Sequence, residues 1–320
     1  MIRKDGYVTI GGVEQWLQIR GEDSRNPVLL VVHGGPGSPY SLFTPLLRDW
    51  ERDFTVVHWD RRGCGRTLRR NRKPTAAELT FDRMVADGIE VGEHLCREFG
   101  RRQIMLMAGS MGTIVGLPMI RRRPDLFSAY IGTDFYVNMV DNDRRGLRDT
   151  LERLRTAGNR RGVAALEKID DDPSKWTVKQ WVTRMQWSMA TDPVSPNVVT
   201  KLIIPLLLRR NRDYSLIDSW YWLKGFGAVR DAMFDQFMRF DARAIGTRFE
   251  VPFYLFQGAQ DVVTLTEPAV EYFNEIEAPA KKLVLFDRAS HFCSFTRPAA
   301  FLAALKQIPP ERSAGAVSLN

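Results

Sequence analysis

The sequence predicts an α/β fold in which a mostly parallel sheet has helices on both faces and carries an inserted helical cap. Two observations support this fold class. Short, continuous apolar runs alternate with helical patterns over residues 28–134 and again over 251–308, which is the element order of a parallel sheet. The stretch between them is helical in pattern throughout. We therefore expect a first core part at 1–134, a cap at 135–245, a second core part at 246–308 and a tail at 309–320.

The first half of the chain contains most of the expected sheet. Two β-type runs joined by Gly11 and Gly12 predict a hairpin over 7–21. Continuous apolar runs predict buried strands over 28–33, 54–60, 103–109 and 127–134. Apolar residues at helical spacing predict helices over 81–100 and 110–124.

The insertion is rich in tryptophan, and buried strands resume after it. The insertion holds five of the eight tryptophans, namely Trp176, Trp181, Trp187, Trp220 and Trp222. We interpret most of them as cap core, and expect some to form an aromatic pocket if the substrate is an ester. After the insertion, the pattern predicts strands over 251–258 and 281–287 and a closing helix over 297–308. We expect the cap to lie over the carboxyl edge of the sheet, where ligands bind in open α/β sheets.

Composition argues against several classes of partner. The 320-residue chain carries a formal net charge of +8 at pH 7, but its basic clusters are scattered and no nucleic-acid motif accompanies them. We interpret them as a solvated, arginine-rich surface and expect no nucleic-acid partner. No apolar run is long enough for a signal peptide or a membrane span, so we expect no membrane partner. No metal cluster, phosphate loop or dinucleotide fingerprint occurs, so we expect no metal and no cofactor.

The number and spacing of the cysteines indicate the redox environment of the protein. Cys64, Cys96 and Cys293 form an odd, widely spaced set. That arrangement is atypical of a disulfide framework and favours a reducing, cytoplasmic environment. The sequence leaves the oligomeric state open.

The stretch MAGSMGT, residues 107–113, lies where a strand ends and a helix begins. Ser110 stands at the junction, with Ala108 and Gly112 two residues away on either side. A sharp turn of this kind needs small residues at those positions, and it holds the serine hydroxyl at the sheet edge and at the positive end of the helix. The pattern is typical of a serine nucleophile, with alanine in place of the usual first glycine.

A serine nucleophile needs a general base, and the chain offers four histidines. His33, His58 and His94 lie within or at the ends of expected strands and a helix, and we interpret them as structural. His291 lies in a loop after the last expected strand and before the last helix. We therefore expect His291 to be the base.

The base in turn needs an orienting acid from a loop that precedes it. Asp261 follows the strand before that of His291, and gives the chain order Ser110, Asp261, His291 of the α/β-hydrolase fold. Asp134 is the rival acid, because it follows the strand just before the insertion. We favour Asp261 on the position of its loop.

The segment HGGPG, residues 33–37, supplies the expected oxyanion hole. When a serine attacks a carbonyl, two backbone N–H groups must point at the oxygen that becomes negative. One is expected from Met111, the residue after the nucleophile, and the other from the loop after the early buried strand. We assign the second donor to Gly35, with Gly34 as the alternative, because glycine lets the backbone approach the substrate closely.

Five segments together resemble the proline iminopeptidase family of serine peptidases, which has an α/β-hydrolase core and a helical cap. They are HGGPG (33–37), WDRRGCGRT (59–67), AGSMG (108–112), GAQD (258–261) and His291. The resemblance covers both halves of the core in the expected order, and implies release of an N-terminal residue from small peptides. Asp60 and Arg66 in the second segment are expected to pair and hold that loop near the oxyanion site.

The chain departs from that family in two places. The family usually has tryptophan after the nucleophile, where this chain has Met111. Members that remove N-terminal proline bind the ammonium with cap glutamates, often beside tryptophans, whereas the matching stretch MQWSMATDP has a tryptophan but no glutamate. We name Trp187 and Asp192 as candidate substrate-binding residues, with Asp213 and Asp218 as further acidic candidates.

Three classes of function follow from these residues. The first is a serine aminopeptidase, and the second is a carboxylesterase or lactonase on the same fold. The third is a non-catalytic binding protein, which the combination of serine, acid, histidine and glycine loop disfavours. A dehalogenase-type aspartyl nucleophile is disfavoured because Ser110 holds that position. The expected partner is a small-molecule or short-peptide substrate.

Overall fold

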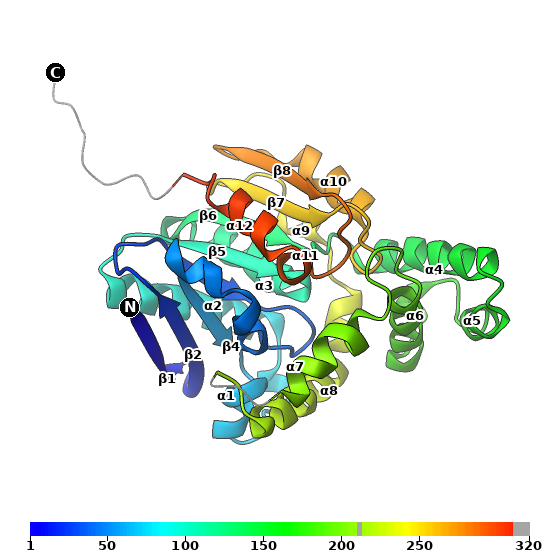
Figure 1. The fold of residues 1–320 in the computed structure, drawn as a ribbon, viewed down its shortest axis with the longest axis horizontal. Coiled ribbons are helices and arrows are strands. Elements are labelled where there is room, and N and C mark those ends of the chain that lie inside the picture. The colour runs from blue at the N-terminus through cyan, green and yellow to red at the C-terminus, as the bar shows by residue number, and fades with distance from the viewer. Residues whose placement is uncertain (210–212, 310–320) are drawn as a thin grey trace.

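An eight-stranded sheet forms the centre of the molecule, with the strand order β1-β2-β4-β3-β5-β6-β7-β8 (Figure 1). The structure, a computed structural model, describes residues 1–209 and 213–309. The strands are β1 Ile2–Ile10, β2 Val13–Gly21, β3 Val28–Val32, β4 Thr55–Asp60, β5 Ile104–Gly109, β6 Phe127–Thr133, β7 Phe253–Gly258 and β8 Lys281–Phe286. The β1–β2 and β2–β4 pairs are antiparallel, and all other pairs are parallel. The predicted fold class is confirmed.

The hairpin of β1 and β2 turns at the two expected glycines. Gly11 and Gly12 have φ values of 56° and 76°. Positive φ at both central residues is typical of the tight hairpin turn whose twist matches that of the strands. β1 begins at Ile2, earlier than the predicted start at residue 7.

Helices cover both faces of the sheet. α2 (Phe81–Phe99), α3 (Thr113–Arg122) and α10 (Thr266–Glu275) share an apolar cluster with one face. α11 (Cys293–Thr296) and α12 (Pro298–Leu305) share another cluster with the opposite face. α1 (Gly65–Arg70) follows β4. Shorter 3₁₀ segments span Tyr40–Leu46, Arg48–Arg52, Ala76–Glu78, Ser110–Gly112, Pro124–Leu126 and Pro173–Lys175, and a π-helical turn spans Val199–Ile203.

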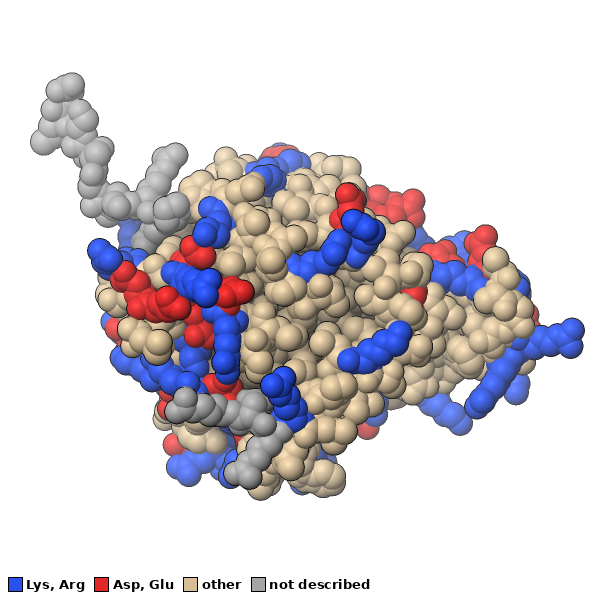
Figure 2. All heavy atoms as spheres, in the orientation of Figure 1, with Lys and Arg blue, Asp and Glu red and all other residues tan. Residues whose placement is uncertain are grey.

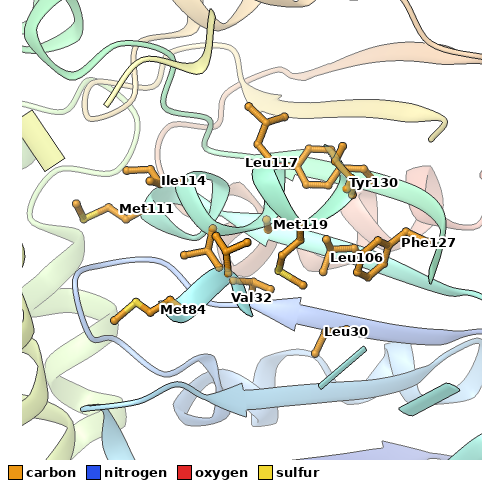
Figure 3. Close-up of a cluster of buried hydrophobic side chains, with 14 of the residues drawn as sticks. Leu30, Val32, Met84, Leu106, Met111, Ile114, Leu117, Met119, Phe127 and Tyr130 are labelled. Atoms are coloured by element: carbon orange, nitrogen blue, oxygen red, sulfur yellow. The ribbon is translucent and has the colours of Figure 1, made fainter. Parts of the chain in front are cut away.

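Alternation along the central strands divides the core into two layers. Leu30 and Val32 of β3 and Leu106 of β5 face the layer of α2 and α3, where Met84 and Ile114 lie (Figure 3). The alternate residues of β3, Leu29 and Val31, face the opposite layer. A central strand that is buried on both faces is therefore apolar at every position, which is why the sequence shows continuous apolar runs there.

In its described residues, the chain between β6 and β7 forms six α-helices and no named strand. They are α4 (Met139–Thr156), α5 (Arg160–Leu166), α6 (Val178–Ala190), α7 (Ile204–Leu208), α8 (Leu216–Met238) and α9 (Ala242–Ile245). α4, α5 and α6 share an apolar cluster and project at one end of the molecule (Figure 1). α7 and α8 pack against each other, and α8 also packs against α1. Apart from Pro309, the expected tail at 309–320 lies outside the described residues.

The sequence makes predictions about the surface charges, the cysteines and membrane-spanning segments, and each can be compared with the structure. Basic and acidic side chains lie intermixed over the region of β1 and β2 on the face in Figure 2. Cys64, Cys96 and Cys293 are all buried and free of disulfides. Among the described residues, no helix is long and apolar enough to cross a membrane.

Candidate active site

Ser110 lies on a strained turn between β5 and α3. Its φ of 53° is in the left-handed region, which is rare for a residue with a side chain and recurs at functional sites. The neighbours must be small, because a Cβ on Gly112 would lie 2.3 Å from the Val32 carbonyl oxygen. Ala108 likewise faces Gly116, whose added Cβ would lie 2.6 Å from the Ala108 Cβ. These contacts explain why small residues flank Ser110 in the sequence.

Three side chains from distant segments form a hydrogen-bonded chain. The Ser110 Oγ lies 3.1 Å from His291 Nε2. On the other side of the ring, His291 Nδ1 lies 2.9 Å from Asp261 Oδ2 and 3.2 Å from Oδ1. All three residues are buried. This arrangement is suited to nucleophilic attack by the serine, with the histidine as base and the carboxylate as its partner.

Asp261 is fixed by several donors at the start of the loop after β7. Its Oδ1 accepts hydrogen bonds from the N–H groups of Val263 and Thr264, at 2.8 Å and 3.0 Å. Its Oδ2 accepts from the Thr264 hydroxyl at 2.7 Å and from Gln257 Nε2 at 3.1 Å. Sequence reasoning missed Thr264 and Gln257 as supports of the acid. The available signal was the loop aspartate itself, since an aspartate side chain often accepts from the backbone N–H two residues on.

Asp134, the rival acid, also lies at the site. A nitrogen of His291 and oxygens of Asp134 and Asp261 all lie within 4.8 Å of one another. The Asp134 carboxylate is fully buried, and Cys293 interacts with it through its backbone and its side chain. Burial raises the pKa of Asp134 to about 6, an effect that the nearby His291 opposes. Of the two acids, Asp261 is the one hydrogen-bonded to His291 Nδ1, while Asp134 acts on the ring through its charge.

The pKa of His291 predicts the acidic limb of the pH profile. Burial alone would lower it, but the charges of Asp261 and Asp134 outweigh burial and raise it above its usual value of 6.5. Because a general base must be neutral, kcat/KM should fall as pH drops through a value above 6.5. Asp134→Asn removes one of these charges and should move the limb to lower pH. A pH series of kcat/KM for both proteins checks this, and a limb that stays in place would contradict the role of Asp134.

The HGGPG loop lies directly against the nucleophile. A Cβ on Gly34 would lie 2.7 Å from the Ser110 Cβ, 2.7 Å from the Tyr40 hydroxyl and 2.8 Å from the Gly109 carbonyl oxygen. Gly35 has a φ of 51° and lines the same cavity as Ser110 and Met111. Because glycine has no side chain, the backbone of this loop can lie close to the place where an oxyanion would form.

Gly34→Ala should disable the site because the added methyl group meets rigid backbone and the Ser110 side chain. Displacing the loop would misplace an oxyanion donor, so we expect kcat to fall on the order of 100-fold or more. Gly6→Ala is the matched control, because its added Cβ meets nothing within 4 Å. Steady-state kinetics of both folded variants checks the prediction, and equal activities would contradict it.

Buried polar contacts hold this loop in place. His33 Nδ1 lies 2.9 Å from the Gly34 carbonyl oxygen. The Arg61 guanidinium donates to the His33 carbonyl oxygen at 2.8 Å. Burial and the Arg61 charge together lower the pKa of His33 well below its usual value, so its ring is neutral. The interpretation of His33 as structural agrees with these contacts.

The expected pair of Asp60 and Arg66 forms through the backbone and not through the two charges. The Arg66 N–H donates to Asp60 Oδ2 at 2.9 Å, and the Ser41 hydroxyl donates to Oδ1 at 2.8 Å. The Arg66 guanidinium instead pairs with Asp218 at 2.9 Å. Burial raises the pKa of Asp60 to about 6, although the Arg66 N–H and charge oppose the rise.

Asp213 and Asp218, the further acidic candidates, are engaged with arginines. Asp213 pairs with Arg3, Arg20 and Arg48, and Asp218 pairs with Arg66 and Arg69. Both carboxylates are buried. Their charges are therefore compensated within the protein.

A cavity of about 620 Å³ opens at the nucleophile, between the sheet and the cap. At the sheet side it is lined by Gly35, Ser110, Met111 and His291. The cap side is mostly apolar, with Trp181, Met185 and Met189 from α6, Leu207 from α7, and Trp222 and Phe226 from α8. Its size is within the usual range for small-molecule sites. Among the described lining residues there is no aspartate, glutamate or lysine, and Arg230 is paired with Asp231 at 2.8 Å.

Trp187 and Asp192 are not among the described residues that line this cavity. Trp187 packs within the cap, where a Cβ on Gly162 would lie 3.1 Å from its ring. Asp192 is buried, and its Oδ1 accepts from the N–H groups of Val194 and Ser195, both at 2.8 Å. Both residues make these contacts within the cap. The tryptophans at the cavity wall are Trp181 and Trp222, two of the five that the sequence analysis names.

Curated relatives with sequence similarity are named as peptidases. The chain is 26% identical over 305 residues to the probable aminopeptidase YbaC of Bacillus subtilis, covering 94% of each chain. It is 21% identical over 315 residues to a proline iminopeptidase of Saccharolobus solfataricus, covering 95% of this chain and 91% of the relative.

Solved structures with the same fold include peptidases and epoxide hydrolases. A proline iminopeptidase of Mycobacterium smegmatis matches 95% of this chain and 97% of its own, with a TM-score of 0.69 and 17% identity. A proline iminopeptidase-related protein of Thermus thermophilus matches 96% and 97%, with a TM-score of 0.63 and 23% identity. An epoxide hydrolase of Vigna radiata matches 95% and 97%, with a TM-score of 0.58 and 17% identity. The alpha/beta hydrolase family model matches residues 29–305, so the chain belongs to the alpha/beta hydrolase family.

Proposed function

We propose that this chain is a serine hydrolase that cleaves uncharged, largely apolar carboxylic esters through an acyl-enzyme on Ser110. The observation that carries the proposal is the hydrogen-bonded chain at the cavity floor, with Ser110 Oγ 3.1 Å from His291 Nε2 and Asp261 Oδ2 2.9 Å from Nδ1. A serine so placed is activated for attack on a carbonyl carbon.

In the proposed reaction, Ser110 Oγ attacks the carbonyl carbon while His291 Nε2 takes the hydroxyl proton. The charge of Asp261 stabilises the imidazolium that forms. The N–H groups of Gly35 and Met111 stabilise the oxyanion of the tetrahedral intermediate. Collapse expels the leaving alcohol, which takes the proton from His291. A water molecule, deprotonated by His291, then releases the acid and restores Ser110.

The cavity wall supports an uncharged substrate. Its cap side consists mainly of methionine, leucine and aromatic side chains, and its described lining offers no carboxylate. A buried ammonium without an anionic partner carries a large desolvation penalty. An apolar acyl or alcohol group gains free energy from the same wall, at about 25 cal/mol for each Å² of apolar surface buried.

An aminopeptidase is the second candidate, and the printed names of the relatives favour it. Two of them, in Bacillus subtilis and Saccharolobus solfataricus, align over nearly the whole chain. For this candidate the α-ammonium needs a carboxylate, and the acids near the site are Asp134, which is beside His291, and Asp192, whose charge acts on the same ring. Neither lines the cavity.

A substrate panel separates the two candidates. We expect higher kcat/KM for nitrophenyl esters with apolar acyl groups than for prolyl or alanyl anilides, with acetylation of the anilides causing no loss. A preference for free amines over acetylated ones on the order of 100-fold would instead support the aminopeptidase, because it would report a specific contact to the ammonium. Absence of turnover for every ester and amide by the folded protein would contradict the serine hydrolase itself.

A further inference from the structure

The exposed apolar side chains of this protein gather on two cap helices. Eight large hydrophobic residues are exposed in the described part of the chain, and Met1 and Leu285 are the two that lie elsewhere. The six on α7 and α8, here called the α7–α8 face, are Ile204, Leu208, Leu216, Ile217, Trp220 and Leu223. Leu208 is 72% exposed and Trp220 is 62% exposed. Single exposed hydrophobic residues are ordinary, but such a group marks an interaction surface.

Helical spacing places these residues together. On α8, Leu216, Trp220 and Leu223 follow one another at intervals of four and three residues, which is one stripe of a helix. On α7, Ile204 and Leu208 are separated by one turn. The two helices pack against each other and lie side by side in Figure 1.

Between residues 201 and 224, which contain the α7–α8 face, every exposed charged side chain among the described residues is positive. Lys201, Arg209 and Lys224 are exposed. Between residues 193 and 230 the sequence contains two acidic residues, Asp213 and Asp218, and both are buried against arginines. The exposed carboxylates of α8, Asp231 and Asp235, lie beyond this segment, and Asp231 is paired with Arg230. An apolar surface whose own exposed charges are cations complements an anionic amphiphile, as interfacial helices do.

The α7–α8 face continues into the catalytic cavity. Ile204 and Leu223 are 41% and 52% exposed, yet both also line the cavity that holds Ser110. Leu207 of α7 and Trp222 of α8 are buried and line the same cavity. An apolar chain can therefore pass from the outer surface to the cavity without leaving apolar contact.

From these four observations we infer that the α7–α8 face docks on an anionic lipid surface and places the mouth of the cavity against it. The contact is peripheral and needs no membrane-spanning helix. It differs from the sequence-based expectation of no membrane partner, which rested on the absence of a spanning segment. Docking itself does not depend on the proposed esterase activity, so the two can fail separately.

Vesicle flotation of the full chain tests the inference. We expect binding to vesicles that contain phosphatidylglycerol, weaker binding to pure phosphatidylcholine, and loss of binding at high salt because the cations are then screened. The double variant Leu208→Asp/Trp220→Asp should weaken binding at least about tenfold. Leu285→Asp is the matched control, since Leu285 is 43% exposed but lies on β8. Lys201→Gln/Lys224→Gln should lose mainly the preference for the anionic lipid.

The experiment distinguishes loss of docking from loss of the proposed hydrolase activity. Leu208 and Trp220 do not line the cavity, so hydrolysis of a small soluble ester by the double variant serves as the check of its fold and of the proposed activity. No vesicle binding by the unmodified chain would overturn the inference, as would equal binding by Leu208→Asp/Trp220→Asp and Leu285→Asp. A dimer, seen by light scattering and dissociated by the double variant, without vesicle binding would assign the face to a second copy and equally overturn the inference.

Discussion

Ser110→Ala is expected to lower kcat by about 10⁴-fold or more while the fold stays intact. The substitution removes the one atom that would form the acyl-enzyme and leaves Cβ, so no new steric contact arises at the turn. A loss of 10⁴-fold corresponds to about 5.4 kcal/mol of transition-state stabilisation. Residual turnover would come from the oxyanion donors and the cavity.

Ser290→Ala is the matched control for this prediction. Ser290 precedes His291, is fully buried, and its hydroxyl has no hydrogen-bond partner among the described residues. Its replacement should leave kcat within a few-fold of the unmodified protein. Circular dichroism and thermal unfolding of both variants report whether the fold is kept. Near-normal kcat in a folded Ser110→Ala protein would remove Ser110 from the proposed mechanism.

Asp261→Asn should have the second-largest effect, lowering kcat by about 10³-fold to 10⁴-fold. The carboxylate accepts from His291 Nδ1 at 2.9 Å, and an amide in its place neither stabilises the imidazolium nor fixes the required tautomer. The N–H groups of Val263 and Thr264 can still donate to the remaining amide oxygen. The main loss should appear in kcat, with a smaller loss of stability, because an amide nitrogen at the Oδ2 position cannot accept from the Thr264 hydroxyl or from Gln257 Nε2.

Asp134→Asn tests the assignment of the acid. Asp134 makes no hydrogen bond to His291 in the described structure, so its replacement should change kcat less than about tenfold at alkaline pH, where the base is neutral in both proteins. Kinetics of the two asparagine variants on the same ester gives the comparison. If Asp134→Asn were the more damaging of the two, Asp134 would be the orienting acid.

The core was predictable because its central strands are buried on both faces. β3, β4, β5 and β7 are apolar or small at most positions, so each is visible as a continuous run in the sequence. The helices α1 and α10 were missed. α1 has six residues, and α10 has a proline at its third position, so neither gives a long apolar stripe.

Chain order and loop position alone predict that Ser110, Asp261 and His291 act together. The sequence does not show which of Asp261 and Asp134 bonds to the histidine. The strands that precede them, β6 and β7, are neighbours, and both carboxylates lie within 4.8 Å of a His291 nitrogen. Trp187 and Asp192 were chosen by similarity of a stretch to a family. The face that a cap residue presents depends on how the helices pack against one another, which periodicity along one helix does not determine.

Labelling of the intact protein by an activated ester or an organophosphonate tests the central claim most directly. Mass spectrometry should find one adduct per chain, located on the peptide that contains Ser110, with hydrolytic activity lost in proportion to labelling. The Ser110→Ala protein should acquire no such adduct. Stoichiometric inactivation with the adduct on another residue, or full activity in a protein labelled at Ser110, would contradict the account.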